Sequence, residues 1–524
     1  MLAWSCTGNY MDINSNPYEV SRDQMMADGY AVSAAMKALC STVVSTDVNT
    51  AQLTDALLGS VCGGYYATSN NGFANTVDNF NPTDDWTRVL MSSDRIIPLL
   101  YSNLAELKTL ANEPEVMAIA NIVKVMAMHR VTDTFGPIPY SQIGVDGKIQ
   151  VPYDSQESIY RLMFEQLDEA VEVLSDANGQ LSANVDPVYN GDFKKWMKLA
   201  NSVKLRLAMH IVYADRALAR EMAESAVKAG VLTDNTDNAQ LPASAFGKDG
   251  NPLLVSCRYN TPTHEDKTTC ATGGDSHVAA DIICYMNGYN DPRREKYFVK
   301  SEWEGYEYAG MRRGIEIPSK DQIGHKYSGV NLSVDSPLQW MNAAEVAFLK
   351  AEAAAVFGFD MGGSAKDFYE QGVRLSFAQW GVSGVDEYLA DAVSVPERYT
   401  DPAGTNSYTE ALSTLSVAWN EGAETAEKQE RIIIQKWIAN FNLGHEAWVD
   451  YRRTGYPHLI PATDAGNKSG GVVNSKSGAR RMPYPQAEFT NNAQNIQYAV
   501  AEYLGGPDNM ATRVWWDCNP ATGE

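Results

Sequence analysis

Apolar side chains recur at helical spacing near the C-terminal end of the chain. Within residues 429–459 they stand at Ile434, Trp437, Ile438 and Phe441. Positions i, i+3, i+4 and i+7 share one face of a helix, so the pattern predicts a helix that buries this face.

A second amphipathic helix is predicted directly after this one. The break falls at Asn442-Leu443-Gly444, and the second helix carries Trp448 and the pair Arg452-Arg453. Gly444 and Gly455 stand where a helix needs a left-handed residue just past its end, and Pro457 follows where a helix does not continue. We expect a helical hairpin whose two arginines pair with carboxylates or helix ends.

The same periodicity predicts helices along most of the chain. They cover residues 23–43, 50–58, 85–110, 113–130, 156–175, 192–213, 216–229, 343–356, 363–380 and 426–442. Alanine-rich helices in successive pairs are typical of a tetratricopeptide-like stack, although no strict repeat of about 34 residues is present. The predicted fold is therefore mainly α, a superhelix of tetratricopeptide-like helix pairs.

The helical period fades over about residues 232–342, where Asn, Asp, Gly, Thr and Tyr predominate. We interpret this stretch as a loop-rich lobe with short strands, inserted into a single domain that spans 21–524. Residues 63–72 form another Gly/Asn/aromatic loop, and long loops of this kind are often functional. Residues 1–20 have no period and suit an N-terminal tether.

Charge and hydropathy narrow the class of protein. The chain has 524 residues and a formal charge of −23, from 42 Lys+Arg against 65 Asp+Glu. Nucleic-acid binding needs clusters of basic residues, so no nucleic-acid partner is expected. No apolar run reaches the roughly 18–20 residues that span a bilayer. The protein is expected to be soluble or lipid-anchored.

Cys6 is the candidate lipid anchor among seven cysteines. The preceding Leu2-Ala3-Trp4-Ser5 resembles the end of a bacterial lipoprotein signal, in which a small residue comes before the cysteine. The alternative is an ordinary exposed cysteine. No CxxC pair occurs, which argues against a zinc ribbon or a thioredoxin-type site. Spacing does not reveal whether the other six form disulfides.

Motifs for catalysis are not found. His445-Glu446 lacks a second histidine one helical turn later, where Val449 stands, and Gly381-Val382-Ser383-Gly384-Val385 lacks the last glycine of a nucleophile elbow. The seven histidines are scattered, so we expect no metal and no cofactor. A glycosidase needs two acids about 5–10 Å apart, which sequence neither reveals nor excludes.

Aromatic and amide residues in the two loop regions are the remaining chemical signal. Sugar rings present apolar C–H faces flanked by hydroxyls, and aromatic platforms with polar neighbours match them. The alternative is that these rings pack the loops onto the helices. The candidate ligand-binding residues are Tyr65, Tyr66, Asn70, Asn71, Tyr259, Trp303, Tyr306 and Tyr308.

Several blocks together resemble one protein family. They are residues 12–18 (DINSNPY), 132–140 (TDTFGPIPY), 191–211, 291–298 (DPRREKYF), 344–354 (AEVAFLKAEAA), 435–459 and 480–496. In this order the blocks are similar to the SusD/RagB family of nutrient-binding outer-membrane lipoproteins, and to its SusD-like branch in particular.

The resemblance implies a fold, a location and a function. It implies four tetratricopeptide-like helix pairs beside a loop-rich lobe, and a lipidated cysteine, here Cys6, that anchors the protein at the cell surface of Bacteroidetes. Such proteins cover a TonB-dependent SusC-like transporter and pass oligosaccharide to it, or peptide in the RagB-like case; they are not enzymes. Family binding sites lie in variable loops, so the resemblance assigns no ligand residue.

The sequence therefore predicts a cell-surface glycan-binding lipoprotein. A peptide-binding protein of the same type is the first alternative. A secreted helical glycoside hydrolase or lyase is the second, and a scaffold that binds protein partners through its helices is the third.

Overall fold

The computed structural model describes residues 29–92, 95–248, 250–257, 275–323 and 326–523. One hydrophobic core runs through nearly all of this length, from Ala35 to Trp516. A smaller cluster around Met311 and Tyr327 lies mostly within the loop-rich stretch 232–342. No described helix combines the length and apolar composition needed to cross a membrane. The predicted anchor Cys6 and tether 1–20, together with Tyr259, lie outside the described residues.

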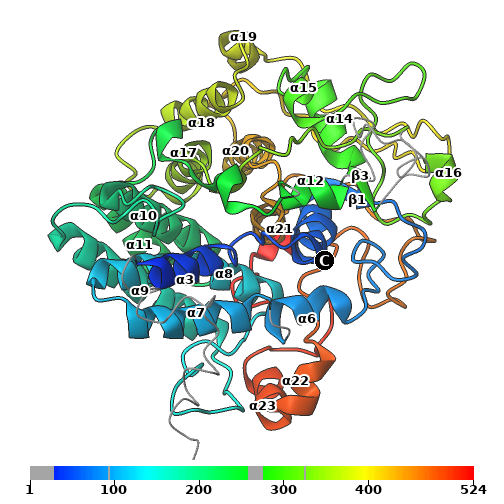
Figure 1. The fold of residues 1–524 in the computed structure, drawn as a ribbon. Helices are drawn as coiled ribbons and strands as arrows, with labels where there is room; N and C mark the ends of the chain where they lie inside the picture. The colour runs from blue at the N-terminus through cyan, green and yellow to red at the C-terminus, as the bar shows by residue number, and fades with distance from the viewer. Residues whose placement is uncertain (1–28, 93–94, 249, 258–274, 324–325, 524) are drawn as a thin grey trace, which may run out of the picture.

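Paired helices form the helical side of the molecule (Figure 1), as the periodicity predicts. The packed pairs are α3 (Tyr30–Cys40) with α7 (Ile97–Leu110), α8 (Pro114–Phe135) with α9 (Gln156–Asp176), α10 (Phe193–His210) with α11 (Arg216–Ala229), and α17 (Ala343–Glu352) with α18 (Ala365–Gln379). α9 also packs on α10, which joins successive pairs into one stack. The mainly helical superhelix is confirmed.

The long helix predicted over residues 85–110 is wrong in one respect. It consists of α6 (Asp85–Met91) and α7, with Pro98 in the first turn of α7. Proline has no N–H to donate and suits only the first turn, so α7 starts afresh there. The helix predicted over 50–58 is also composite, since α4 (Val48–Ala51) continues through a π-helical stretch, Gln52–Gly59, into α5 (Ser60–Cys62).

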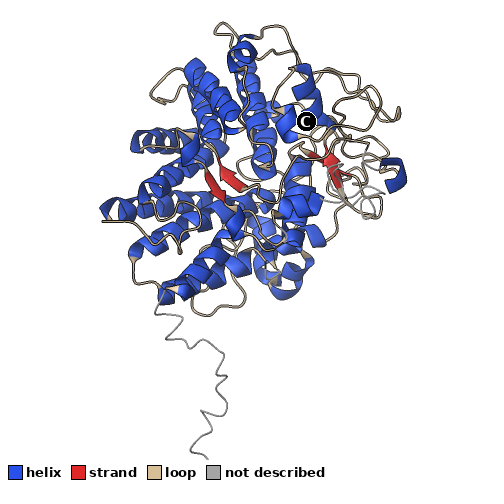
Figure 2. Ribbon diagram, turned by 45° about the horizontal axis from the view of Figure 1, so that its top comes forward, coloured by secondary structure: helices blue, strands red, loops and turns tan. Residues whose placement is uncertain are grey.

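The loop-rich lobe lies beside the stack and contributes three of the four described short strands, as predicted, while the fourth belongs to the loop of residues 63–72. β1 (Tyr66–Thr68) pairs antiparallel with β3 (Ser276–Val278), and β2 (Ala239–Leu241) with β4 (Leu338–Met341). Figure 2 shows these two small sheets among the helices.

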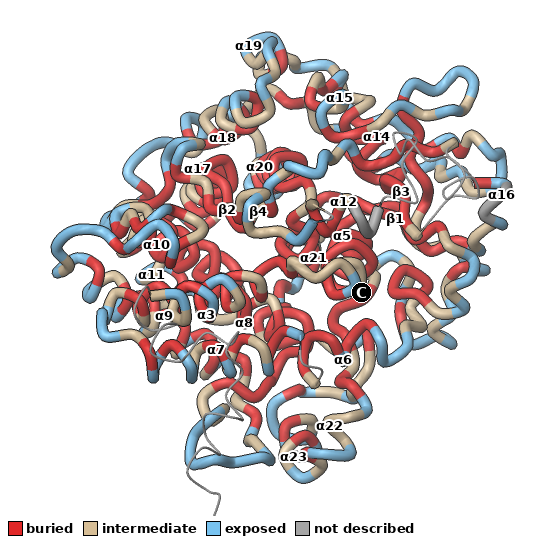
Figure 3. Tube along the Cα trace, in the orientation of Figure 1, coloured by how far each residue is buried: buried red, intermediate tan, exposed pale blue. Residues whose placement is uncertain are grey.

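Short helices in the lobe were not predicted from the sequence. α14 (Ala280–Gly288) is buried along almost its whole length, so it has no polar face to give a helical period. The others are α12 (Pro252–Cys257), α15 (Arg294–Tyr297) and α16 (Lys320–Ile323). Three more short helices lie outside the lobe: α19 (Val385–Ala390), α22 (Gln486–Asn491) and α23 (Ala493–Glu502). The last two lie at an exposed edge of the molecule (Figure 3).

The predicted hairpin is formed by α20 (Thr425–Ala439) and α21 (Gly444–Thr454). Gly455 ends α21 in the left-handed conformation, as expected. The prediction for Gly444 is wrong, because Asn442 takes the left-handed conformation (φ 78°) and Gly444 begins α21. Gly444 is a close-approach residue instead: a Cβ there would collide with the backbone of Gly59 and Ser60.

Both arginines of the hairpin are fully buried. Arg453 pairs with the carboxylates of Glu352 and Asp450. Arg452 donates to the backbone oxygens of Asp133 and Arg480, and its guanidinium lies 3.8 Å from the ring centroid of Trp448. The expected pairing with carboxylates or helix ends is confirmed, since Arg453 binds carboxylates and Arg452 binds a backbone oxygen in the last turn of α8. Both arginines fasten the hairpin to the rest of the core.

Candidate functional site

Tyr65 and Tyr66, two of the predicted ligand residues, have no exposed surface. Tyr65 donates its hydroxyl proton to the backbone oxygen of Trp437 (2.6 Å) and stacks on that indole at 5.5 Å between centroids. The hydroxyl of Tyr66 donates to Asn442 Oδ1 (2.6 Å). Both rings therefore pack the first loop onto the hairpin and offer no platform to a sugar, which corrects the sequence-based expectation.

Asn70 and Asn71 continue the same loop toward the surface. Asn70 is half-buried and donates from Nδ2 to Asp275 Oδ1 (2.6 Å), while its Oδ1 accepts from the backbone of Gly72 (2.9 Å). Asn71 is exposed. A ligand role for these two amides stays a prediction.

Trp303 packs against the smaller hydrophobic cluster around Met311 and Tyr327. Its ring lies 5.7 Å from that of Tyr327, and the ammonium of Lys326 lies 4.9 Å from the Trp303 centroid. The backbone oxygen of Trp303 accepts from the backbone N–H of Tyr306 (3.2 Å). Trp303 thus anchors the turn that presents Tyr306.

Tyr306 and Tyr308 are brought together in a pocket of about 380 Å³, which we name the tyrosine pocket. Tyr306 is 37% exposed, so a ligand can reach its ring, whereas Tyr308 is 6% exposed and forms part of the pocket wall. The pocket lies against α14 and is completed by Cys284, Asn287, Arg294, Glu397 and Tyr399.

A chain of hydrogen bonds orders the polar side of the tyrosine pocket. Arg294 Nη1 donates to Asn287 Oδ1 (3.1 Å), and Asn287 Nδ2 donates to Glu397 Oε1 (2.9 Å). The guanidinium of Arg294 also lies 5.7 Å from the ring centroid of Tyr308. Partial burial raises the pKa of Glu397, and the Asn287 hydrogen bond and the Arg294 charge oppose this rise. Rings beside fixed donors and acceptors suit a hydroxylated ligand.

Sequence reasoning missed Asn287, Arg294 and Glu397 as site residues. Arg294 belongs to the block 291–298, one of those that carry the family resemblance, and the resemblance assigns no ligand residue. The neighbouring Arg293 does serve the scaffold, because it is buried and bound to Asp291. Arg294, the first residue of α15, lines the tyrosine pocket instead.

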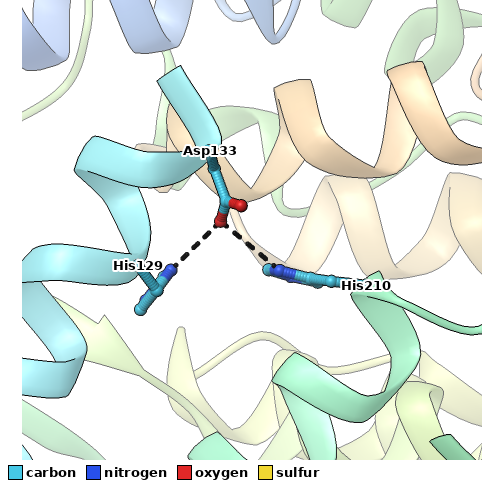
Figure 4. Close-up of side chains that lie close together, drawn as sticks. All are labelled: His129, Asp133 and His210. Carbon is cyan, nitrogen blue, oxygen red and sulfur yellow. Dashed lines mark hydrogen bonds and ion pairs between the residues drawn. The ribbon is translucent and has the colours of Figure 1, made fainter. Parts of the chain in front are cut away.

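A second polar cluster lies in the core, where His129, Asp133 and His210 meet (Figure 4). Their ligand atoms lie within 4.8 Å of one another, a set of groups that could hold a metal ion. Asp133 Oδ2 is 3.4 Å from Nδ1 of each histidine. Asp133 Oδ1 accepts hydrogen bonds from the hydroxyl of Tyr160 (2.6 Å) and from Trp516 Nε1 (2.7 Å).

Proton accounting favours a hydrogen-bonded network over a metal centre. His210 Nε2 lies 3.1 Å from Glu446 Oε2, and a carboxylate only accepts. His210 Nδ1 lies 3.1 Å from the Tyr160 hydroxyl, which already donates to Asp133 and so accepts here. Both nitrogens of His210 therefore carry protons and lack a free lone pair. Burial lowers the pKa of His210, but the charges of Glu446 and Asp133 outweigh it and the net shift is upward.

His129 has the opposite environment. Burial lowers its pKa despite the hydrogen bond to Asp133. Its Nε2 is buried without a hydrogen-bond partner in the described part of the chain. His129 and Glu446 both line a cavity of about 20 Å³, which is large enough for one water. The cluster therefore ties α8, α10 and α21 together.

The fold and the pocket define a helical-repeat protein with a loop-built lobe. The family model described as Susd and RagB outer membrane lipoprotein matches residues 12–517. The chain belongs to this family of outer-membrane lipoproteins, and the resemblance drawn from its sequence blocks is confirmed.

Solved structures agree with this assignment. A SusD homolog from Bacteroides uniformis is 57% identical, with a TM-score of 0.89 over 94% of this chain and all of that one. A second, from Bacteroides thetaiotaomicron, is 37% identical, with a TM-score of 0.84 over 93% and 98%. A chitin-binding SusD homolog from Flavobacterium johnsoniae is 35% identical, with a TM-score of 0.82 over 94% and 100%. No curated protein sequence matches the chain.

Proposed function

We propose that this protein is a cell-surface lipoprotein that captures a glycan and delivers it to a TonB-dependent SusC-like transporter. Membership of the SusD/RagB family carries the proposal, and the 35% identity to a chitin-binding homolog supports glycan as the ligand class. The protein binds its ligand without chemical conversion. Cys6 is the proposed lipid anchor at the outer membrane.

The tyrosine pocket is the proposed capture site. The exposed ring of Tyr306 stacks on a sugar face, while Arg294 and Asn287 hydrogen-bond the hydroxyls at its edge. Arg294 and Asn287 hold each other in place before the ligand arrives, so little side-chain entropy is lost on binding. Affinity stays modest, which allows release to the transporter.

Affinity electrophoresis over a panel of soluble glycans, including a soluble chitin derivative, tests the capture site. Tyr306→Ala is expected to abolish retention by the glycan that retains the wild type, with no change in Tm. Tyr498→Ala is the matched control, since Tyr498 is 58% exposed on α23 and outside the pocket. Equal retention of wild type and Tyr306→Ala contradicts the site assignment. Retention by no glycan, together with binding on a peptide array, establishes the peptide-binding alternative.

Cell fractionation tests the anchor. Cys6→Ala is expected to appear in the soluble fraction, while Cys518→Ala stays with the membrane; Cys518 is an exposed free thiol and serves as the control. Persistence of Cys6→Ala in the membrane after a high-salt wash contradicts lipid anchoring. Co-purification of the wild type with a SusC-like barrel from the same cells tests delivery to a transporter.

One observation favours the hydrolase alternative and sets its test. The tyrosine pocket holds two carboxylates whose pKa values are shifted apart, since an ion pair with Lys300 lowers the pKa of Glu307 while partial burial raises that of Glu397. Glu307 is paired with Lys300, and Glu397 accepts a hydrogen bond from Asn287. Both carboxylates are therefore already engaged, which favours ligand binding over catalysis. Reducing-sugar release by the wild type that disappears in Glu397→Gln would establish hydrolysis instead.

A further inference from the structure

A second pocket of about 430 Å³ lies between the β2–β4 sheet and the C-terminal end of α18. Seven of its sixteen lining residues are asparagine or glutamine, among them Gln240, Gln339, Gln379 and Asn442, and eight are apolar. Among the described residues that line it, none is charged. Although the chain has a net charge of −23, this wall offers no charged side chain that could pair with an ionic ligand. We name this hollow the amide pocket.

The amide pocket contains polar groups with unused hydrogen-bonding capacity. Gln379 Nε2 donates to Gln339 Oε1 (2.9 Å), which leaves Gln379 Oε1 and Gln339 Nε2 buried without partners among the described residues. Trp380, at the same wall, packs edge-on against Tyr297 (4.7 Å between ring centroids), and its buried Nε1 has no well-aligned hydrogen-bond partner in the described part of the chain. An unpaired buried polar group is unfavourable, because it has lost its hydrogen bonds to water without gaining others. The last torsion of glutamine is broad, so a modest rotation turns these amides toward a ligand.

The amide groups of Gln339 and Gln379 can form hydrogen bonds with the hydroxyl groups of a ligand. Each amide offers both a donor and an acceptor, as each hydroxyl does, so one hydroxyl placed between Gln339 and Gln379 replaces their single shared bond with two. Trp380 is half-buried and Phe441 is 4% exposed, and both add apolar wall suited to C–H groups. The volume falls within the range of ligand pockets, about 300–1,000 Å³.

We propose that the amide pocket is a second carbohydrate-binding site that takes one or two neutral sugar residues. It is distinct from the tyrosine pocket, because the two share no lining residue. The rings of Phe441 and Phe298 are 5.4 Å apart and those of Phe298 and Tyr308 6.2 Å apart, so a wall of aromatic rings separates them. The inference rests on the wall chemistry of the amide pocket and stands whether or not the tyrosine pocket binds.

Fluorine NMR of the full chain labelled with 5-fluorotryptophan gives a local readout. The chain has 11 tryptophans, and Trp380→Phe identifies the signal of Trp380. The probes are triacetylchitotriose, maltotriose, cellotriose and xylotriose at millimolar concentration, with trigalacturonate and tetra-alanine as charged and peptide comparisons. All spectra are recorded in the Tyr306→Ala background, which removes the proposed capture site.

A saturable shift of the Trp380 signal with at least one neutral trisaccharide is the expected result. The double variant Gln339→Leu/Gln379→Leu is expected to weaken that binding by at least about tenfold. Because it removes both partners of one hydrogen bond, it should remain folded. Gln371→Leu is the control on the same helix, as it does not line the pocket.

Three outcomes would overturn the inference. They are no shift with any neutral trisaccharide, a shift with tetra-alanine or trigalacturonate alone, and unchanged sugar affinity in the double variant while the circular dichroism spectrum is native. Failure of the proposed capture site has a separate signature, namely equal glycan retention of wild type and Tyr306→Ala.

Discussion

Arg453 donates two hydrogen bonds to Glu352, from Nη1 to Oε1 at 2.6 Å and from Nη2 to Oε2 at 2.8 Å, with both side chains fully buried. The pair joins α21 to the end of α17. Asp450 extends it, since it accepts from Arg453 (2.9 Å) and forms an ion pair with Lys436 (2.9 Å).

Breaking this network from one side should be costly. Arg453→Met leaves the Glu352 carboxylate buried without its partner, so we expect the free energy of unfolding to fall by about 3–5 kcal/mol. Urea denaturation measures the change. Arg161→Met is the control, because Arg161 forms exposed ion pairs and should cost no more than about 1 kcal/mol. Equal losses of unfolding free energy in the two variants would show that the buried pair contributes no more to stability than an exposed ion pair.

Gly444→Ala tests the close approach of the hairpin to the chain before β1. The added Cβ would overlap the backbone of Gly59 and Ser60, which cannot yield as a flexible side chain can. We expect a loss of at least about 3 kcal/mol, the upper end of the usual overpacking cost. Gly247→Ala, where a Cβ meets open space, should leave the Tm unchanged. A native Tm for Gly444→Ala would contradict the packing described.

His210 should make stability depend on pH. Its folded-state pKa is raised above the unfolded value of about 6.5, so its contribution is full below that pH and is lost as pH rises through the folded-state pKa. His129, whose pKa is lowered, acts in the opposite direction: its contribution is lost as pH falls below about 6.5.

NMR of selectively labelled histidines separates the two. His210 should titrate above pH 6.5 and disappear from the spectrum in His210→Gln. In that variant, the fall of stability with rising pH should also be weaker than in the wild type. Titration of His210 below pH 6.5 would contradict the doubly protonated ring between Glu446 and Tyr160.

Tyr65→Phe distinguishes packing from ligand binding in the first loop. Losing the hydroxyl that donates to the Trp437 backbone should cost about 0.5–1.5 kcal/mol of stability, plus the penalty of the unpaired oxygen. Glycan retention in affinity electrophoresis should be unchanged. Loss of retention at native stability would restore Tyr65 to the binding site.

The hydrophobic period predicts a helix correctly where one face of the helix is exposed to solvent and capping residues mark its ends. α11 occupies the predicted 216–229 because the Asp215 side chain accepts from the backbone of Leu218 at its start and Gly230 follows its end. The period does not reveal α14, which has no solvent-exposed face, and it does not reveal the break before α7, which Pro98 marks. Segments that are buried all round or divided by a proline give no continuous amphipathic pattern.

The candidate site was less predictable, for a physical reason. Tyr65 and Tyr306 both lie in loops rich in Gly and aromatics, yet one hydroxyl finds a carbonyl in the core and the other ring lies at the surface. Composition does not distinguish these fates, because tyrosine is stable in either setting. Arg294 and Glu397 reach the tyrosine pocket from separate parts of the chain, which only the tertiary fold brings together.

Asn442 belongs both to the hairpin and to the amide pocket. It holds the left-handed bend, accepts from the buried Tyr66 hydroxyl, and lines the pocket beside residues of β2, β4 and α18. The fold therefore requires Asn442, whereas Gln240 has no comparable structural role among the described residues. A laboratory-evolution library that seeks a new ligand preference here should randomise Gln240, Gln339 and Gln379 and keep Asn442, since variants at that position would be lost to misfolding before selection reached their binding.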